Sequence, residues 1–255
     1  MHCKNCGQSI KTNDKYCSEC GAKIIEGRLT VSKLSGEFMH SLWSLGSNKP
    51  LLTFVDLFRK PIQVIDGYIH GIRKKYISPY GYFTIALILT GLYTYINLNY
   101  FPEFLESSGI NANIEDKDIS REVTTKVLEH INLITFIFIP LITLISRFIF
   151  LRIKKYNLAE HFIIHLYAYS HVHIATSLII LVSFVDERAY KLSNLISIPI
   201  YIIYYTALFK RLYSLKLWKV ILKTLLFLIL MGIVIGVISI SVLYFYLKNY
   251  QAQGI

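Results

Sequence analysis

Four cysteines stand within the first 20 residues, and their spacing carries the clearest chemistry in the chain. They form two Cys-x-x-Cys pairs, each followed directly by a glycine, at Cys3, Cys6, Cys17 and Cys20. Two thiolates three positions apart can approach a metal ion from one side, and the glycine permits the positive φ at which the chain turns away. Four thiolates complete the tetrahedron that Zn²⁺ prefers and leave no open position. The pattern predicts a structural zinc ribbon over residues 1–26, with Zn²⁺ as cofactor.

The surroundings of these cysteines favour a docking role for the ribbon. No apolar signal segment precedes them, so we expect a reducing compartment, where paired cysteines bind metal rather than form disulfides. A head this small buries little apolar surface, and metal binding would supply its folding energy. Residues 1–28 carry five Lys or Arg against three Asp or Glu, with Tyr16 as the one aromatic residue, which argues against a nucleic-acid partner. We therefore expect a protein partner at the ribbon.

The rest of the chain has the composition of an all-α membrane protein. Hydrophobic residues make up 54% and charged residues 17% of the 255 positions, and the apolar residues come in long runs. A typical soluble domain has about 25% charged residues. Five runs approach the ~20 residues needed to cross a bilayer. They place five transmembrane helices within residues 80–255, at about 80–98, 131–150, 160–184, 192–209 and 220–247.

Amphipathic segments are expected between the ribbon and the first span. Residues 27–52 are interpreted as a linker with one short amphipathic segment. Thr53 is expected to cap a helix that starts one residue later. A second helix, over residues 61–75, has an apolar face but is too polar to span. Residues 53–79 are therefore predicted to form interfacial helices at the membrane surface.

A basic and aromatic cluster marks the entry to the first span and orients the protein. It consists of Arg73, Lys74, Lys75 and Tyr76. If the ribbon is cytoplasmic, the cytoplasmic segments carry 21 of the 27 Lys and Arg residues, as the positive-inside rule requires. The N-terminus is then cytoplasmic and the C-terminus outside. We expect the cluster to contact anionic lipid headgroups and to couple the ribbon to the bundle.

The third span contains ionisable residues, which are costly at membrane depth and are candidates for function. Glu160, His161 and His165 lie near its start. The two histidines are about 40° apart on the helix, but the span offers too few converging ligands for a catalytic metal. The order of these residues also differs from a zinc-protease motif. A buried polar contact between helices and a proton- or ligand-linked site at the cytoplasmic mouth both remain open.

Two glycines of the fifth span, Gly232 and Gly236, have the spacing that lets helices approach closely. They predict either packing against a neighbouring span of the same chain or the seam of a homodimer. The first is favoured, because a bundle needs such close approaches. The same spacing at Gly67 and Gly71 predicts that the interfacial helix packs closely on the bundle.

Several motifs together resemble a family of bacterial zinc-ribbon membrane proteins that is catalogued as a domain of unknown function. They are the paired cysteine units, T-F-x-x-L-x-x-x-P at residues 53–61, Y-I-x-G-x-R-x-x-Y-x-x-P at 68–79 and A-E-H at 159–161. The resemblance implies the same architecture, a location in the bacterial inner membrane and no established activity. In span count the chain is also similar, more coarsely, to the Yip-type five-span proteins, which act in membrane trafficking.

These observations favour a non-enzymatic membrane scaffold or adaptor whose zinc ribbon recruits a cytoplasmic partner. The sequence has no phosphate-binding glycine loop and no nucleophile elbow, so an enzyme is not favoured. One alternative is a small transporter or channel-like bundle with a polar site at Glu160, His161 and His165. A second alternative is an intramembrane metal-dependent enzyme.

Overall fold

The structure is a computed structural model that describes all residues except 12–13, 25–26, 32, 35–48, 107–123 and 253–255. Its described part contains five helices that are long and apolar enough to cross a membrane. They are α4 (Pro79–Tyr100), α7 (Ile131–Ile149), α8 (Leu158–Ser183), α9 (Glu187–Tyr213) and α10 (Leu217–Ala252). This arrangement confirms the predicted all-α membrane fold with five spans. A short helix, α5 (Pro102–Glu106), follows the first of them.

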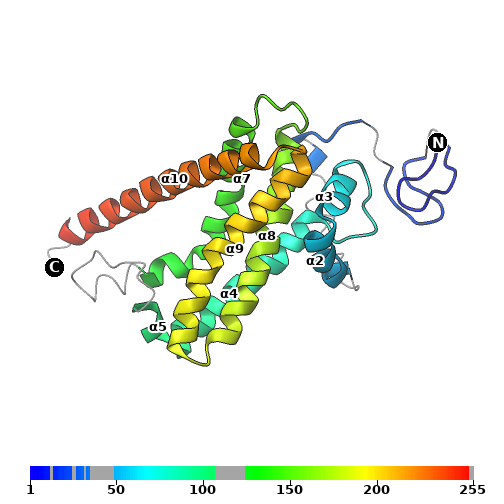
Figure 1. Cartoon of the computed structure of the whole chain (residues 1–255). Coiled ribbons are helices and arrows are strands. Elements are labelled where there is room, and N and C mark those ends of the chain that lie inside the picture. Colours follow the sequence, from blue (N-terminus) through cyan, green and yellow to red (C-terminus); the bar gives the residue numbers. More distant parts are fainter. Residues whose placement is uncertain (12–13, 25–26, 32, 35–48, 107–123, 253–255) are drawn as a thin grey trace.

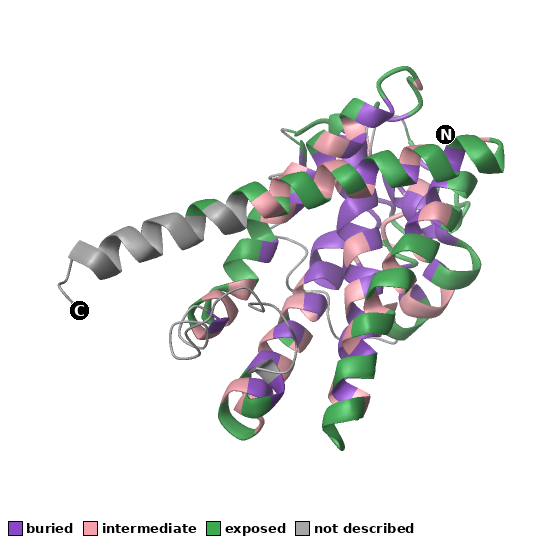
Figure 2. Cartoon of the chain, turned by 60° about the vertical axis from the view of Figure 1, so that its left-hand side comes forward, coloured by how far each residue is buried: buried purple, intermediate pink, exposed green. Residues whose placement is uncertain are grey.

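The central element is α8, against which α4, α7 and α9 all pack (Figure 1). Its apolar segment is the most buried of the five spans. Figure 2 shows the buried residues concentrated along the middle of the bundle. Because α8 is enclosed by three other helices, its polar side chains must find their hydrogen-bond partners inside the bundle.

The last helix, α10, packs on α7 and α9 near its start and then splays away from the bundle (Figure 1). Its apolar segment is the least buried of the five. Beyond its own helix backbone and chain neighbours, a side-chain carbon added at Gly232 or Gly236 would meet no atom of the described residues within 4 Å. The structure therefore does not bring these two glycines against another described span, and their pairing with a second copy stays a prediction.

Two shorter helices, α2 (Lys49–Arg59) and α3 (Pro61–Ile69), precede the first span. The expectation that Thr53 caps the first of them is wrong, because α2 already begins at Lys49. Thr53 is instead fully buried inside the helix. Its hydroxyl donates to the carbonyl of Lys49 at 2.7 Å and accepts from the amide of Ile77 at 3.1 Å. The threonine thus ties α2 to the loop that leads into α4.

The second short helix, α3, ends at Ile69 and does not continue to residue 75. Gly71 has a φ of +103°, a left-handed conformation that stops the helix. The amides of Gly71 and Ile72 donate to the carbonyls of Tyr68 and Gly67, which is the hydrogen-bond pattern of a Schellman motif. Gly67 and Gly71 therefore do not lie on one continuous helix, because Gly71 ends α3. Six of the nine α3 residues are buried, and the helix packs against α8 and α9.

The residues that follow the zinc ribbon are attached to the bundle. Leu29 and Leu34 are buried in the main hydrophobic core. The carbonyl of Leu34 accepts a hydrogen bond from the hydroxyl of Tyr80 in α4 at 3.2 Å. The start of the segment interpreted as a linker therefore runs across the bundle and buries apolar side chains there.

Candidate functional site

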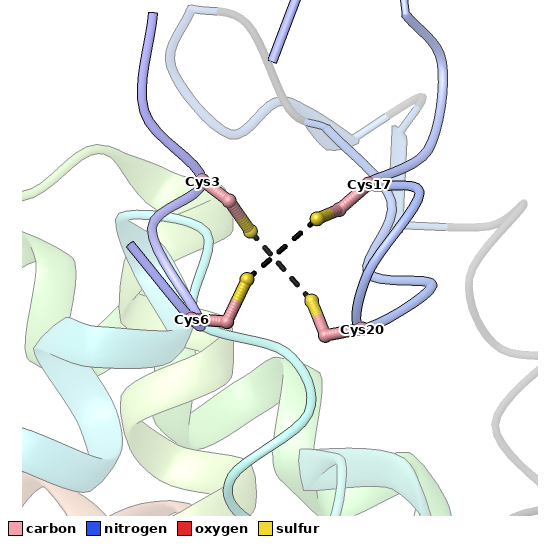
Figure 3. A group of neighbouring side chains, drawn as sticks. All are labelled: Cys3, Cys6, Cys17 and Cys20. Carbon is pink, nitrogen blue, oxygen red and sulfur yellow. Dashed lines mark hydrogen bonds between the residues drawn. The ribbon is translucent and has the colours of Figure 1, made fainter. Parts of the chain in front are cut away.

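The four cysteine side chains point toward one common position (Figure 3). Their sulfur atoms all lie within 4.8 Å of one another. The Cys3 and Cys20 sulfurs are 3.7 Å apart, and the Cys6 and Cys17 sulfurs are 3.6 Å apart. A tetrahedral Zn²⁺ with Zn–S distances of about 2.3 Å requires sulfur–sulfur separations of roughly 3.8 Å. The arrangement therefore fits a closed four-thiolate zinc site and confirms the predicted structural zinc.

The two halves of this site are copies of one turn. The amide of Gly7 donates to the carbonyl of Cys3 at 2.8 Å, and the amide of Gly21 donates to the carbonyl of Cys17 at 2.8 Å. Both glycines have positive φ, +78° and +62° respectively. A side chain would strain this backbone, which explains the glycine after each cysteine pair.

Backbone amides also stabilise the thiolate form of one of the four cysteines, Cys3. The amides of Cys6 and Asn5 donate to the Cys3 thiol and lower its pKa to about 6. Zinc binds the thiolate form of cysteine. The hydrogen bonds of this turn therefore favour the metal-binding form of Cys3.

Asn5, which lies inside the first cysteine pair, docks the ribbon onto the membrane domain. Its side-chain oxygen accepts hydrogen bonds from the amides of Arg73 and Lys74 at 2.8 and 2.9 Å. Its side-chain nitrogen donates to the carbonyl of Gly71 at 3.3 Å. The sequence alone gives no sign of this contact, because no local pattern connects Asn5 with a loop so far along the chain. The contact uses the loop that Gly71 creates by ending α3.

The four residues of the basic and aromatic cluster at 73–76 have different surroundings: two contact the protein and two are exposed. The guanidinium of Arg73 lies 3.6 Å from the centre of the Tyr68 ring, in a cation–π contact. Tyr76 is buried and donates to the Asp56 carboxylate at 2.8 Å, and burial together with this bond raises the pKa of Tyr76. Lys74 and Lys75 are exposed. Contact of this cluster with anionic lipid stays a prediction. Lys74 and Lys75 are its exposed cationic residues and are therefore the candidates for that contact.

Glu160 caps α8 and holds the segment that follows the ribbon. Its side chain accepts from the amide of Asn157 at 2.8 Å while the Asn157 side chain accepts from the Glu160 amide at 2.9 Å, which forms a capping box. Arg28 donates from two nitrogens to the two carboxylate oxygens, both at 2.8 Å. The Glu160 side chain is only 3% exposed. Both of its oxygens are thus occupied by the protein itself.

His161 and His165 have different surroundings. The His161 ring nitrogens lie 3.1 Å from the hydroxyl of Ser146 and 3.3 Å from that of Tyr213. His165 is fully buried against the rings of Tyr205 and Phe227. Neither nitrogen of His165 has a hydrogen-bond partner in the described chain. Within the described residues, no side-chain hydrogen bond joins these two histidines to each other or to Glu160, so the three side chains do not form one hydrogen-bonded unit.

This difference predicts opposite effects of the same substitution. We expect His165→Leu to raise the free energy of unfolding by about 1–2 kcal/mol, because it removes buried polar atoms that make no hydrogen bond. His161→Leu should lower it by a similar amount, because it leaves the Ser146 and Tyr213 hydroxyls without their partner. Thermal unfolding of the detergent-solubilised variants measures both. A destabilised His165→Leu variant would contradict this view and would mean that the buried imidazole contributes to stability through its ring contacts.

Two further histidines of α8 connect it to neighbouring helices. His171 lies 2.9 Å from the hydroxyl of Tyr82 in α4. The His173 ring nitrogens lie 2.6 Å from the hydroxyl of Thr90 in α4 and 3.1 Å from that of Tyr201 in α9. With His161, these contacts support the interpretation of the span's histidines as buried polar contacts between helices.

Comparison with known protein families identifies two regions of the chain. Residues 2–24 match a zinc-ribbon domain, and residues 48–91 match a protein of unknown function (DUF3667). The second match contains α2, α3, the loop that Asn5 contacts and the first half of α4. A search of curated proteins and a search of solved structures found no match, and the likeness to Yip-type proteins has no support. The chain is therefore similar to a zinc-ribbon domain over residues 2–24 and to a domain of unknown function over residues 48–91, the combination that its motifs predict.

Proposed function

We propose that this protein is a non-enzymatic scaffold or adaptor of the bacterial inner membrane, whose cytoplasmic zinc ribbon recruits a protein partner. The observation that carries the proposal is a ribbon with a closed metal site and a defined attachment to the bundle. Four thiolates leave no zinc position for a substrate. Asn5 attaches the ribbon to the membrane domain, and Arg28 attaches the segment that follows the ribbon. A ribbon held in this way is suited to presenting a surface at a set height above the membrane.

The charge distribution supports this orientation. Five spans would put the two termini on opposite sides of a membrane, and 21 of the 27 Lys and Arg residues would then lie on the side of the ribbon. Lys and Arg are enriched in cytoplasmic loops of membrane proteins. We therefore assign the N-terminus and the ribbon to the cytoplasm and the C-terminus to the outside.

Tyr16 is the best candidate for contact with the partner. It belongs to the second half of the ribbon, whereas Asn5, which docks the ribbon, belongs to the first half, and it is 56% exposed. Tyrosine is enriched among the residues that dominate protein–protein binding. We therefore place the partner's contact on the part of the ribbon around Tyr16.

Affinity capture of the intact protein from its own membrane tests the proposal. A protein enriched by the natural chain should be lost from Tyr16→Glu by about tenfold or more, because interface aromatic residues contribute about 2 kcal/mol or more. The capture should persist with Lys11→Gln, a matched substitution on an exposed ribbon residue. Zinc content must be equal in the two variants. Equal capture by both would remove Tyr16 from the interface, and equal capture by a Cys3→Ser, Cys6→Ser variant would overturn recruitment by the ribbon.

One observation favours the alternative of a small transporter or channel-like bundle. His165 keeps two unpaired nitrogens in the interior of the described bundle, where they could interact with a passing ion or proton. This alternative reverses the pattern of the variants. His165→Leu would abolish the cellular phenotype of the protein, whereas the loss of Cys3 and Cys6 would be tolerated.

A further inference from the structure

A pocket lies where the ribbon, the segment after it, the end of α3 and the start of α8 meet. Its volume is about 360 Å³, within the usual range of small-ligand sites. Five of its lining residues carry a charge or an imidazole: Lys4, Arg28, His70, Lys155 and Glu160. They come from four separate segments, and the pocket therefore exists only while the ribbon is docked.

The charge of this pocket favours an anion. Lys4, Arg28 and Lys155 contribute three positive charges, and Glu160 contributes the one negative charge among the lining residues. Both oxygens of Glu160 already accept hydrogen bonds from Arg28 and Asn157. The carboxylate is therefore committed to the protein and is not free to bind a cation. Counted on the described lining residues, the pocket has a net charge of +2.

Hydrogen-bond donors remain available around the pocket. Lys4 is exposed and makes no hydrogen bond or ion pair with the described chain. Arg28 uses Nε and Nη2 for Glu160 and the Lys155 carbonyl, which leaves Nη1. The Lys155 ammonium has three protons and gives one to the carbonyl of Leu212. His70 bonds the carbonyl of Asp66 through Nδ1 and keeps Nε2.

We infer that this pocket binds a phosphate monoester. Such a group carries about −1.5 to −2 charges at neutral pH, which balances the excess charge of the pocket. It also has three strong acceptor oxygens for the lysine and arginine donors. The ligand is either the headgroup of a lipid such as phosphatidic acid or a water-soluble phosphate monoester. Because it would contact Lys4 of the ribbon and Lys155 of the bundle, it would hold the two together.

The test measures binding of two probes to the full chain in phosphatidylcholine nanodiscs. One probe is glycerol 3-phosphate, titrated by calorimetry, and the other is phosphatidic acid, incorporated into the nanodiscs and detected by native mass spectrometry. A variant with Lys4→Gln and Lys155→Gln should bind each effective probe at least about tenfold more weakly, as expected for losing two charge-assisted contacts. The matched control carries Lys11→Gln and Lys154→Gln, which remove two exposed lysines outside the pocket.

Each outcome decides something. Binding of both probes identifies the phosphate group as the determinant, and binding of phosphatidic acid alone identifies a lipid ligand. Binding of neither probe, or equal weakening in the pocket variant and its control, overturns the inference. The single variant Lys4→Gln is included because it should fold normally: the Lys4 side chain is exposed and does not pack in the core. Weaker binding by this variant alone therefore cannot result from misfolding. The inference does not depend on the scaffold role, since it concerns binding alone and not partner capture.

Discussion

Replacing Cys17 with serine is expected to remove zinc from the protein and to unfold the ribbon. The ribbon has a small apolar cluster built largely from the cysteines themselves, with Ile10 and Ala22 as its other buried members. In small zinc domains the metal contributes roughly 10–16 kcal/mol of apparent binding free energy, which is also the folding energy. Elemental analysis of the purified chain should show a fall from one zinc per chain to background. Hydrogen exchange at the Gly21 amide should become fast, because its bond to the Cys17 carbonyl is lost.

The matched control for this prediction is His2→Ala. His2 is adjacent to the first ligand, but its ring nitrogen lies 3.1 Å from the Gly7 carbonyl and not at the metal position. This variant should keep one zinc per chain. Full zinc retention by Cys17→Ser would contradict the four-thiolate site. More than one zinc in the natural protein would revive the alternative of an intramembrane metal-dependent enzyme.

Replacing Arg28 with methionine is expected to destabilise the start of α8 and to release the segment after the ribbon. The substitution leaves the almost fully buried Glu160 carboxylate without its cation. Breaking a buried ion pair costs about 3–5 kcal/mol and an exposed pair about 0–1 kcal/mol. Because the Arg28 side chain is 55% exposed, we expect a loss of about 1–3 kcal/mol. Thermal unfolding gives the loss, and hydrogen exchange at Leu29 and Asn157 shows whether it is local.

A double-mutant cycle separates the ion pair from other effects of the change. Glu160→Gln keeps a side chain that can accept the capping bond of Asn157 but removes the charge. The double variant should be less destabilised than the sum of the two single variants, because each removes the same interaction. Simple additivity of the two losses would show that Arg28 and Glu160 do not act as a pair. Lys11→Met serves as the control for removing an exposed cation near the N-terminus.

The zinc site and the spans could be predicted because each depends on short-range chemistry. A Cys-x-x-Cys-Gly turn brings two sulfurs together within five residues, and Gly7 and Gly21 have the positive φ that this turn requires. A run of about 20 apolar residues must be helical in a bilayer, since no water is present to satisfy its backbone. The loop charges suggest an orientation for the same local reason. The proposal that the ribbon is cytoplasmic and the C-terminus external rests on these loop charges.

The glycines at the end of α3 and in the last span show where such patterns stop being informative. The same four-residue spacing occurs at Gly67 with Gly71 and at Gly232 with Gly236. In the first pair Gly71 ends a helix, and the second pair faces open space. Two glycines four residues apart allow another helix to approach closely. Whether such a helix is present depends on the packing of the whole bundle.

The sequence by itself determined the ribbon, its metal, the number of spans and the class of fold, because the residues responsible are neighbours along the chain. Only the tertiary structure decided what Asn5 and Glu160 do. Asn5 docks a metal site onto a distant loop, and Glu160, besides its local cap with Asn157, binds the distant Arg28. It also separated His161, whose ring is hydrogen-bonded, from His165, whose ring nitrogens have no partner among the described residues, although the two lie about one helical turn apart. A side chain's partners come from whichever elements pack beside it, and that packing is a property of the folded chain as a whole.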